Sequence, residues 1–155
     1  MEERYWLFKS EPTAYSFDDL IKDEVAEWDG VRNYQARNML RDDVQEGDKI
    51  LFYHSNTQPL AVVGTALVVR AGYPDHTAWD PESDHPDPKS TPANPIWFMV
   101  DIVPDKLFKG PVTRISMMNN PSLAHMILLK KGTRLSIQPV TKEEFDEIVM
   151  MSDSI

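Results

Sequence analysis

The sequence predicts a single α+β domain spanning residues 1–155, in which short helices flank a small, mostly antiparallel β-barrel of five to six strands. Two observations predict this class. The chain has 155 residues, of which 41% are hydrophobic, so one compact domain can bury a core. Its short apolar segments are separated by turn-forming residues and lack the regular strand–helix–strand order of a doubly wound sheet.

The first half of the chain predicts three strands and two helices. Ser16 and Asp19 have the spacing of a capping box, so the first helix is expected to begin at Ser16. A second helix is expected over residues 31–42, where apolar positions recur at helical spacing. Aliphatic and aromatic residues fill the expected strands, which are residues 4–9, 49–54 and 60–69.

The second half begins with a long segment, residues 72–95, that is rich in proline, aspartate, serine and threonine. We expect a loop there, and a compact domain rarely carries so long a loop without a function. Capping residues indicate that two helices begin at Asn120-Pro121 and at Thr141. The remaining strands are expected at residues 96–103 and 135–140.

Composition limits the kind of partner that the chain can bind. The formal net charge of −9 argues against a broad surface that follows nucleic-acid phosphates, because non-specific affinity comes mostly from basic residues. Any contact with nucleic acid should therefore be local and use a few arginine and lysine side chains. We expect a monomer without a cofactor.

The chain has no cysteine, which excludes disulfides and thiolate metal sites. No apolar segment reaches the roughly 18 to 20 residues that a bilayer-spanning helix needs. The N-terminus has neither the basic start nor the apolar stretch of a signal peptide. We therefore expect a cytoplasmic protein that does not associate with membranes.

The signals for catalysis are weak. His54 and Ser55 are adjacent, but neighbouring side chains on a strand point to opposite faces. The chain has no G-x-S-x-G nucleophile motif and no phosphate-binding glycine loop. Lys9 and Glu11 have the spacing that puts both on one face of a strand, and an ordinary ion pair explains them better than a catalytic pair. We expect no catalytic residues.

The long loop carries five side chains that could ligate a metal. Structural metal sites place their ligands at tight spacing on ordered turns, whereas several prolines make this loop resemble solvated coil. We therefore expect no metal site among these side chains, which are His76, Asp80, Asp84, His85 and Asp87.

Three polar and aromatic clusters fit the recognition of a nucleobase turned out of its helix. Such a base needs an aromatic face, amide or hydroxyl groups for its edge, and a cation for the neighbouring phosphate. Taken alone, each cluster is explained more readily by a buried hydrogen-bond network or by a turn with polar side chains. Taken together, the three clusters predict a polar, aromatic pocket. The clusters are Trp28 with residues 32–38, residues 53–56, and Ser136 with Gln138.

Five segments of the chain, in order, resemble the EVE domain family. The likeness extends from about residue 5 to about residue 148. The segments are residues 5–12 (YWLFKSEP), 30–38 (GVRNYQARN), 52–56 (FYHSN), 87–89 (DPK) and 135–140 (LSIQPV).

The resemblance implies a PUA-like barrel, related to the YTH and ASCH domains, and a non-enzymatic reader of modified bases. The base would be flipped into the pocket, with methylated or hydroxymethylated cytosine in DNA as the first expectation and modified RNA bases as another. Arg32 and Arg37 would contact the backbone phosphates. The residues expected to bind the base are Lys9, Ser10, Trp28, Asn33, Tyr34, Tyr53, His54, Ser55, Asn56, Ser136 and Gln138.

Two features depart from the family pattern. The loop before Asp87 lacks an expected aromatic pair, which leaves the role of the loop in ligand contact open. The basic N-terminal extension of the nuclear members is absent, which favours a cytoplasmic, bacterial-type protein.

Two alternatives belong to other functional classes. One is a small amidohydrolase that acts on acylated nucleosides, as some ASCH proteins do, using Lys9 and Glu11. The other is a protein-interaction module with a vestigial pocket, which an apolar surface patch beside a shallow cleft would favour.

Overall fold

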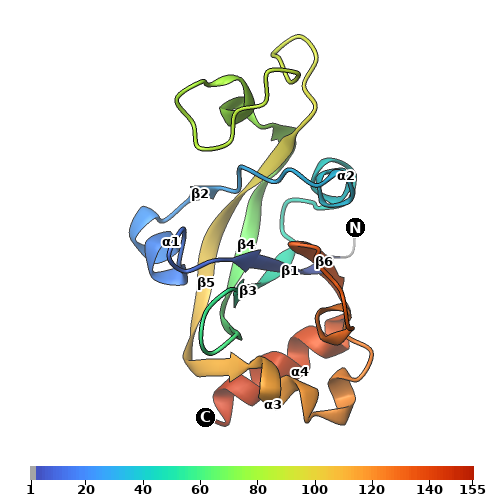
Figure 1. Cartoon of the computed structure of the whole chain (residues 1–155). Helices are drawn as coiled ribbons and strands as arrows, with labels where there is room; N and C mark the ends of the chain where they lie inside the picture. The colour runs from blue at the N-terminus through green and yellow to red at the C-terminus, as the bar shows by residue number, and fades with distance from the viewer. Residues whose placement is uncertain (1–2) are drawn as a thin grey trace.

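The computed structural model describes residues 3–155 and shows a six-stranded sheet with short helices around it (Figure 1). In spatial order the strands are β2 (Ala26–Glu27), β5 (Phe98–Thr113), β4 (Ala61–Pro74), β3 (Lys49–His54), β1 (Tyr5–Ser10) and β6 (Ile137–Val140). The helices are α1 (Phe17–Asp23), α2 (Tyr34–Asp42), α3 (Arg114–Met118) and α4 (Lys142–Asp153). The predicted α+β class is confirmed.

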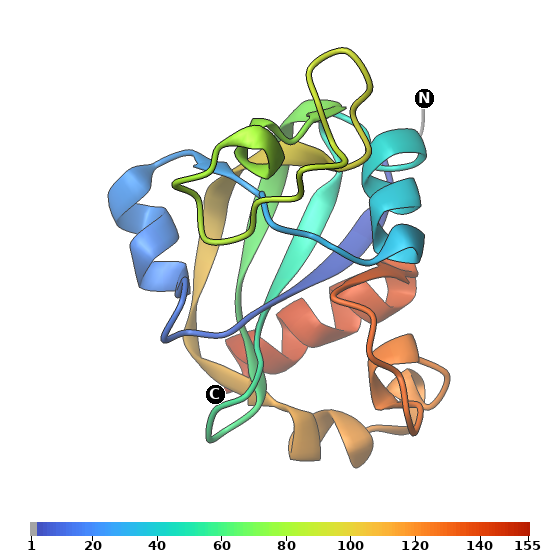
Figure 2. The same cartoon turned by 45° about the horizontal axis from the view of Figure 1, so that its top comes forward.

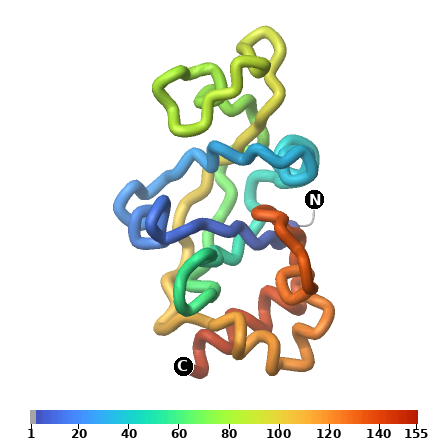
Figure 3. Tube along the Cα trace, viewed as in Figure 1, coloured from blue at the N-terminus to red at the C-terminus, as the bar shows by residue number. Residues whose placement is uncertain are grey.

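The sheet is mostly antiparallel, as predicted, but it is open, so the expectation of a closed barrel is wrong. Among the described strands, β1 and β3 alone pair in parallel. Within residues 3–155 the edge strands β2 and β6 do not pair with each other. Both are short, with two and four residues, and Pro139 in β6 has no N–H to donate. The long strands β4 and β5 extend the length of the molecule (Figure 3).

The two capping boxes predict their helices correctly. The Ser16 hydroxyl accepts a hydrogen bond from the backbone N–H of Asp19 at 3.1 Å, and Thr141 does the same for Glu144. Helix α2 begins at Tyr34 and not at residue 31, because the Asn33 side chain accepts from the N–H of Ala36 and caps the helix there.

The helix expected after Asn120 is wrong. The chain forms two short 3₁₀ turns instead, Pro121–Leu123 and Ile127–Leu129, and the helix α3 precedes them. Buried side chains at positions 123, 126 and 128 follow a spacing of three and two residues, which a continuous α-helix does not give.

The long loop closes a hairpin. Strands β4 and β5 pair from Ala61 opposite Thr113 to Pro74 opposite Phe98, so both strands are longer than expected and the loop covers residues 75–97. It contains one 3₁₀ turn, His76–Trp79. Figure 2 shows this loop folded over the segment that joins β2 to α2. The loop is therefore fixed at both ends by the sheet.

Alternation along β1 divides the core between two faces of the sheet. Trp6 and Phe8 point to a first face, where they pack with buried residues of α1 and α2. Tyr5 and Leu7 point to a second face, where they pack with buried residues of α3 and α4. We use these two names for the faces below.

Asp48 fixes the start of both parallel strands. Its side chain is buried, with 2% of its residue surface exposed. The carboxylate accepts hydrogen bonds from the Trp6 indole N–H at 2.9 Å, the Arg4 N–H at 3.0 Å and the Gln45 N–H at 2.8 Å. One side chain thus ties the beginning of β1 to the turn before β3.

We predict that Asp48→Ala lowers the free energy of unfolding by about 3 kcal/mol, because three donors lose their acceptor and each buried unsatisfied donor costs about 1 to 3 kcal/mol. Urea denaturation measures the change. Asp43→Ala is the matched control, since Asp43 only meets the exposed Arg4 side chain at 3.9 Å, and its cost should stay within about 0.5 kcal/mol. Equal losses for the two variants would contradict this role of Asp48.

Candidate functional site

A cleft of about 720 Å³ lies where β1 and β3 end and β6 begins. Its volume falls within the usual range for small-molecule sites. Four segments that are distant in the sequence form it: the end of β1 with the following loop, the β2–α2 segment, the tip of the loop 75–97, and the residue before β6. Five candidate residues are among those that line it: Lys9, Ser10, Trp28, Arg32 and Ser136.

A second hollow, of about 640 Å³, lies at the opposite end of β1. Arg4, Tyr5, Pro139 and Val140 are among its lining residues, and none of the sequence-based candidates lies there. Five of the sequence-based candidates line the first cleft and none lines the second hollow, so we take the first cleft as the candidate site.

Trp28 forms part of the floor of the cleft and of the core beneath it. Only 9% of its surface is exposed. Its ring packs against Phe8 and Phe52 at centroid distances of 5.4 and 5.5 Å, and the backbone N–H of Trp28 donates to the carbonyl of Val100. Trp28 therefore belongs mainly to the core beneath the cleft, and its removal would also disturb the first face of the sheet.

Tyr15 is a cleft residue that sequence reasoning did not include. Its ring stands at 81° to that of Trp28 and 6.2 Å away, and its hydroxyl donates to Asp23 at 2.9 Å. Burial and the bond to Asp23 raise the pKa of Tyr15, so the phenol stays protonated. Tyr15 directly precedes the Ser16 cap, and no local pattern in the sequence links it to Trp28.

Lys9, Ser10 and Glu11 form the edge of the cleft at the end of β1. Burial, and then the positive charge of Arg114, lower the pKa of Lys9. The Ser10 hydroxyl donates to the carbonyl of Tyr15 at 2.5 Å. No ion pair joins Lys9 to Glu11 anywhere in the described chain, so the expected strand-end pair is absent.

Arg32 holds the long loop against the wall of the cleft. Its guanidinium meets the Asp75 carboxylate at 3.0 Å and donates twice to the carbonyl of His85, at 3.2 and 2.8 Å. Gly30 donates its N–H to the same carboxylate at 2.9 Å. Gly30 has a φ of +77°, and a Cβ there would lie 2.8 Å from the His85 ring, so only glycine fits.

The Asp75 carboxylate is the centre of this network. Burial works against its ionisation, but the hydrogen bonds from Thr77, Gly30 and Arg32 outweigh burial and keep the pKa of Asp75 below its usual value. Nearby, His85 Nε2 lies 3.3 Å from Asp29 Oδ2. The sequence left the role of this loop open, and the structure places it in the lining of the cleft.

Three other candidates lie outside the cleft lining, around α2. Asn33 caps the helix. Tyr34, which is 60% exposed, stacks on Trp97 at 4.9 Å, and Arg37 lies 5.1 Å above the Tyr34 ring and donates to the carbonyl of Ile96. Because Arg32 also lies over Trp97, at 5.4 Å, these rings and cations form one stack beside the cleft.

The remaining candidates are divided between the two faces of the sheet. His54 lies on the first face, where its Nε2 accepts from the N–H of Phe17 at 3.1 Å and burial lowers its pKa. Tyr53 and Gln138 are buried on the second face, by alternation with their neighbours. Ser55 and Asn56 form the turn after β3. The candidates therefore do not all line one cavity, and their roles in binding stay predictions.

Four of the five possible metal ligands of the long loop have other partners, and the fifth, Asp84, is exposed. His76 meets Glu27 at 3.0 Å, and Asp87 accepts from the Trp97 indole at 2.7 Å. Among residues 3–155, no three acidic or histidine side chains are grouped as metal ligands would be. In the same range, no helix combines the length and the apolar character needed to cross a bilayer.

Residues 4–151 match the family model described as the EVE domain. The chain belongs to the EVE domain family. The thymocyte nuclear protein 1 of Mus musculus is 39% identical to it over 168 residues, which cover 97% of this chain and 74% of the mouse protein.

Solved EVE structures resemble the present one closely. A hypothetical protein from Leishmania major has a TM-score of 0.93 and 43% identity, covering 99% of this chain and 96% of that one. The human THYN1 protein, solved in complex with DNA containing 5-methylcytosine, has a TM-score of 0.87 and 36% identity, with 97% and 98% covered. An ASCH protein from Zymomonas mobilis shares only the fold, at a TM-score of 0.53 and 12% identity.

We predict that Asp75→Asn releases the loop 75–97 from the cleft wall. The loss of charged acceptor contacts should cost about 1 to 3 kcal/mol locally, so hydrogen exchange of the loop amides should become faster at pH 7. In the wild type the pKa of Asp75 is lowered. The stabilisation of the loop is therefore full above pH 3.8, the ordinary pKa of an aspartate side chain, and is lost as the pH falls through the lower pKa of Asp75 in the folded protein.

The control is Asp84→Asn, an exposed carboxylate of the same loop outside this network. If the exchange rate of the loop amides is unchanged in Asp75→Asn, or rises equally in both variants, the Asp75 network does not hold the loop in place.

Proposed function

We propose that this protein is a non-enzymatic reader that binds a modified nucleobase, of the methylated or hydroxymethylated cytosine type, by base flipping into the cleft. The supporting observation is the convergence of aromatic edges and polar side chains in one cleft of a chain whose relative, the human THYN1 protein, was solved with 5-methylcytosine DNA. The partner would be DNA or RNA that carries the modified base.

The cleft has the parts that a flipped base needs. Extruding a base costs a few kcal/mol, and less when the base is mismatched, damaged or already single-stranded. Stacking on an aromatic side chain such as Tyr15 would offset about 1 to 3 kcal/mol of this cost. The hydroxyls of Ser10 and Ser136 and the Asp29 carboxylate line the same space. A carboxylate there suits cytosine, whose exocyclic amine donates hydrogen bonds.

The charge of the cleft favours a base over a phosphate. Lys9 and Arg32 are its only lysine and arginine, and Asp75 already neutralises Arg32. A phosphate inside this space would meet like charges, whereas a neutral heterocycle with amine donors would meet acceptors. The carboxylates among the residues that line the cleft are Glu11, Asp23, Glu27, Asp29 and Asp84.

The proposal extends to the whole chain. Residues 1–155 would act as one domain, as a monomer, and without a cofactor. We propose a cytoplasmic location from the sequence pattern alone. The mouse relative is named a nuclear protein, so it does not support this location.

We predict that the wild type binds a single-stranded oligonucleotide containing 5-methylcytosine more tightly than the same oligonucleotide with cytosine. Tyr15→Leu should weaken binding to both by about 5- to 100-fold, because the base loses its stacking partner. Fluorescence anisotropy of labelled oligonucleotides measures both effects. The control is Leu107→Ala, which removes an exposed apolar side chain outside the cleft lining and should leave both affinities unchanged. Equal affinity of the wild type for both bases would contradict the proposal.

The amidohydrolase alternative makes an opposite prediction about turnover. Lys9 and Glu11 both line the cleft, and no ion pair joins them among the described residues. We expect that the protein releases no acetate from N4-acetylcytidine. Chromatography of the reaction mixture measures this. Product formation that Lys9→Ala abolishes would establish the enzyme and refute the reader.

A further inference from the structure

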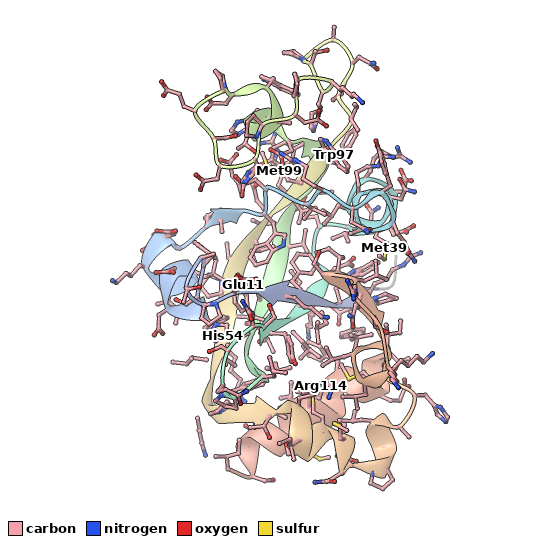
Figure 4. All side chains as sticks on the ribbon, in the orientation of Figure 1. Glu11, Met39, His54, Trp97, Met99 and Arg114 are labelled. Atoms are coloured by element: carbon pink, nitrogen blue, oxygen red, sulfur yellow. The ribbon has the colours of Figure 1, made fainter. Side chains whose placement is uncertain are left out.

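Arg114 lies at the same end of the sheet as the cleft. It follows directly after β5, and its N–H donates to the carbonyl of Leu60 at 2.8 Å. The residue before it, Thr113, continues a row across four paired strands that passes through Ala61 and His54 to Ser10. Figure 4 shows Arg114 on the side of the molecule where Glu11 and His54 lie, away from Trp97.

Arg114 and Lys9 are half-buried cations without a carboxylate partner. The Arg114 guanidinium donates a hydrogen bond to the Met118 sulfur at 3.1 Å, and neither cation belongs to an ion pair in the part of the chain that is described. Two of the basic candidates, Arg32 and Arg37, are by contrast occupied by Asp75 and by the carbonyl of Ile96.

The two cations act on each other and on Tyr53, which lies opposite Lys9 in the parallel pair. After burial, the charge of Arg114 is the second cause that lowers the pKa of Lys9. Burial raises the pKa of Tyr53, and the same charge opposes that rise. Two positive charges that are close together and partly desolvated destabilise the protein without a ligand. A bound anion would offset both the repulsion and the desolvation.

We propose that Lys9 and Arg114 form a phosphate-binding site that holds the backbone phosphate next to the base in the cleft. This inference rests on the proposed function and deepens it. Lys9 also lines the cleft, so the site and the base would be adjacent. The guanidinium fork of Arg114 suits two phosphate oxygens, and the Lys9 ammonium supplies a point charge. The acidic cleft itself would keep the phosphate outside.

The test compares 5-methyl-2′-deoxycytidine with its 5′- and 3′-monophosphates by calorimetry. The wild type should bind one monophosphate at least about tenfold more tightly than the nucleoside, as expected for a charge-assisted contact. Arg114→Ala should remove this advantage and leave the nucleoside affinity unchanged, and Arg114→Lys should keep part of it. Lys9→Met provides a second variant that removes a charge from the same site.

Salt dependence supplies an independent readout. For a single-stranded oligonucleotide, the slope of log affinity against log salt should become shallower by about 0.7 in Arg114→Ala, the value for one phosphate contact. The matched control is Arg4→Ala. It removes an exposed arginine that directly precedes β1, at the other end of this strand from Lys9, and it should leave the slope unchanged. Thermal unfolding checks that each variant folds.

The results separate the two proposals. If Arg114→Ala and Lys9→Met both keep the full phosphate advantage and the full slope, the phosphate site is refuted, although the wild type still distinguishes modified from plain cytosine. If the wild type binds neither the nucleoside nor the oligonucleotides, the reader function fails, and the phosphate site fails with it.

Discussion

The register of β1 between β3 and β6 is the constraint on which the site depends. All six residues of β1 pair with β3 in parallel, so the two strands end together at Ser10 and His54. Because side chains alternate, a slip of one residue would exchange the faces to which Phe8, Lys9 and Ser10 point. The bonds from β1 and the turn before β3 to the single carboxylate of Asp48 oppose such a slip.

The cleft is built by elements that the core already holds. Trp28 joins the cleft floor to the first face through its contacts with Phe8 and Phe52. On the wall, Arg32 and Asp75 fasten the long loop to the β2–α2 segment, so His85 reaches the cleft from more than fifty residues away in the sequence. Because the core holds the cleft floor and the Arg32–Asp75 contact holds the wall, the protein could bind a base without rearranging its sheet. Such preorganisation lowers the free-energy cost of binding.

Local chemistry could be predicted from the sequence, and distant pairing could not. The capping boxes at Ser16 and Thr141 act within four residues, and both helices begin where expected. The open edges of the sheet and the full length of β4 and β5 depend on pairing between distant segments. Arg114 and His85 gave no local signal, because only the fold brings them to Lys9 and Gly30. Tyr53 and His54 were both expected to bind the base, but strand alternation places them on opposite faces.

The most direct test of the central claim is an NMR titration of the protein with 5-methyl-2′-deoxycytidine, which carries no phosphate. A base held in the cleft predicts that the largest shifts of backbone amide signals occur at Ser10, Gly30 and Ser136, which belong to three separate lining segments. Shifts confined to the surface around Tyr34, or to the hollow beside Arg4 and Val140, would contradict the account.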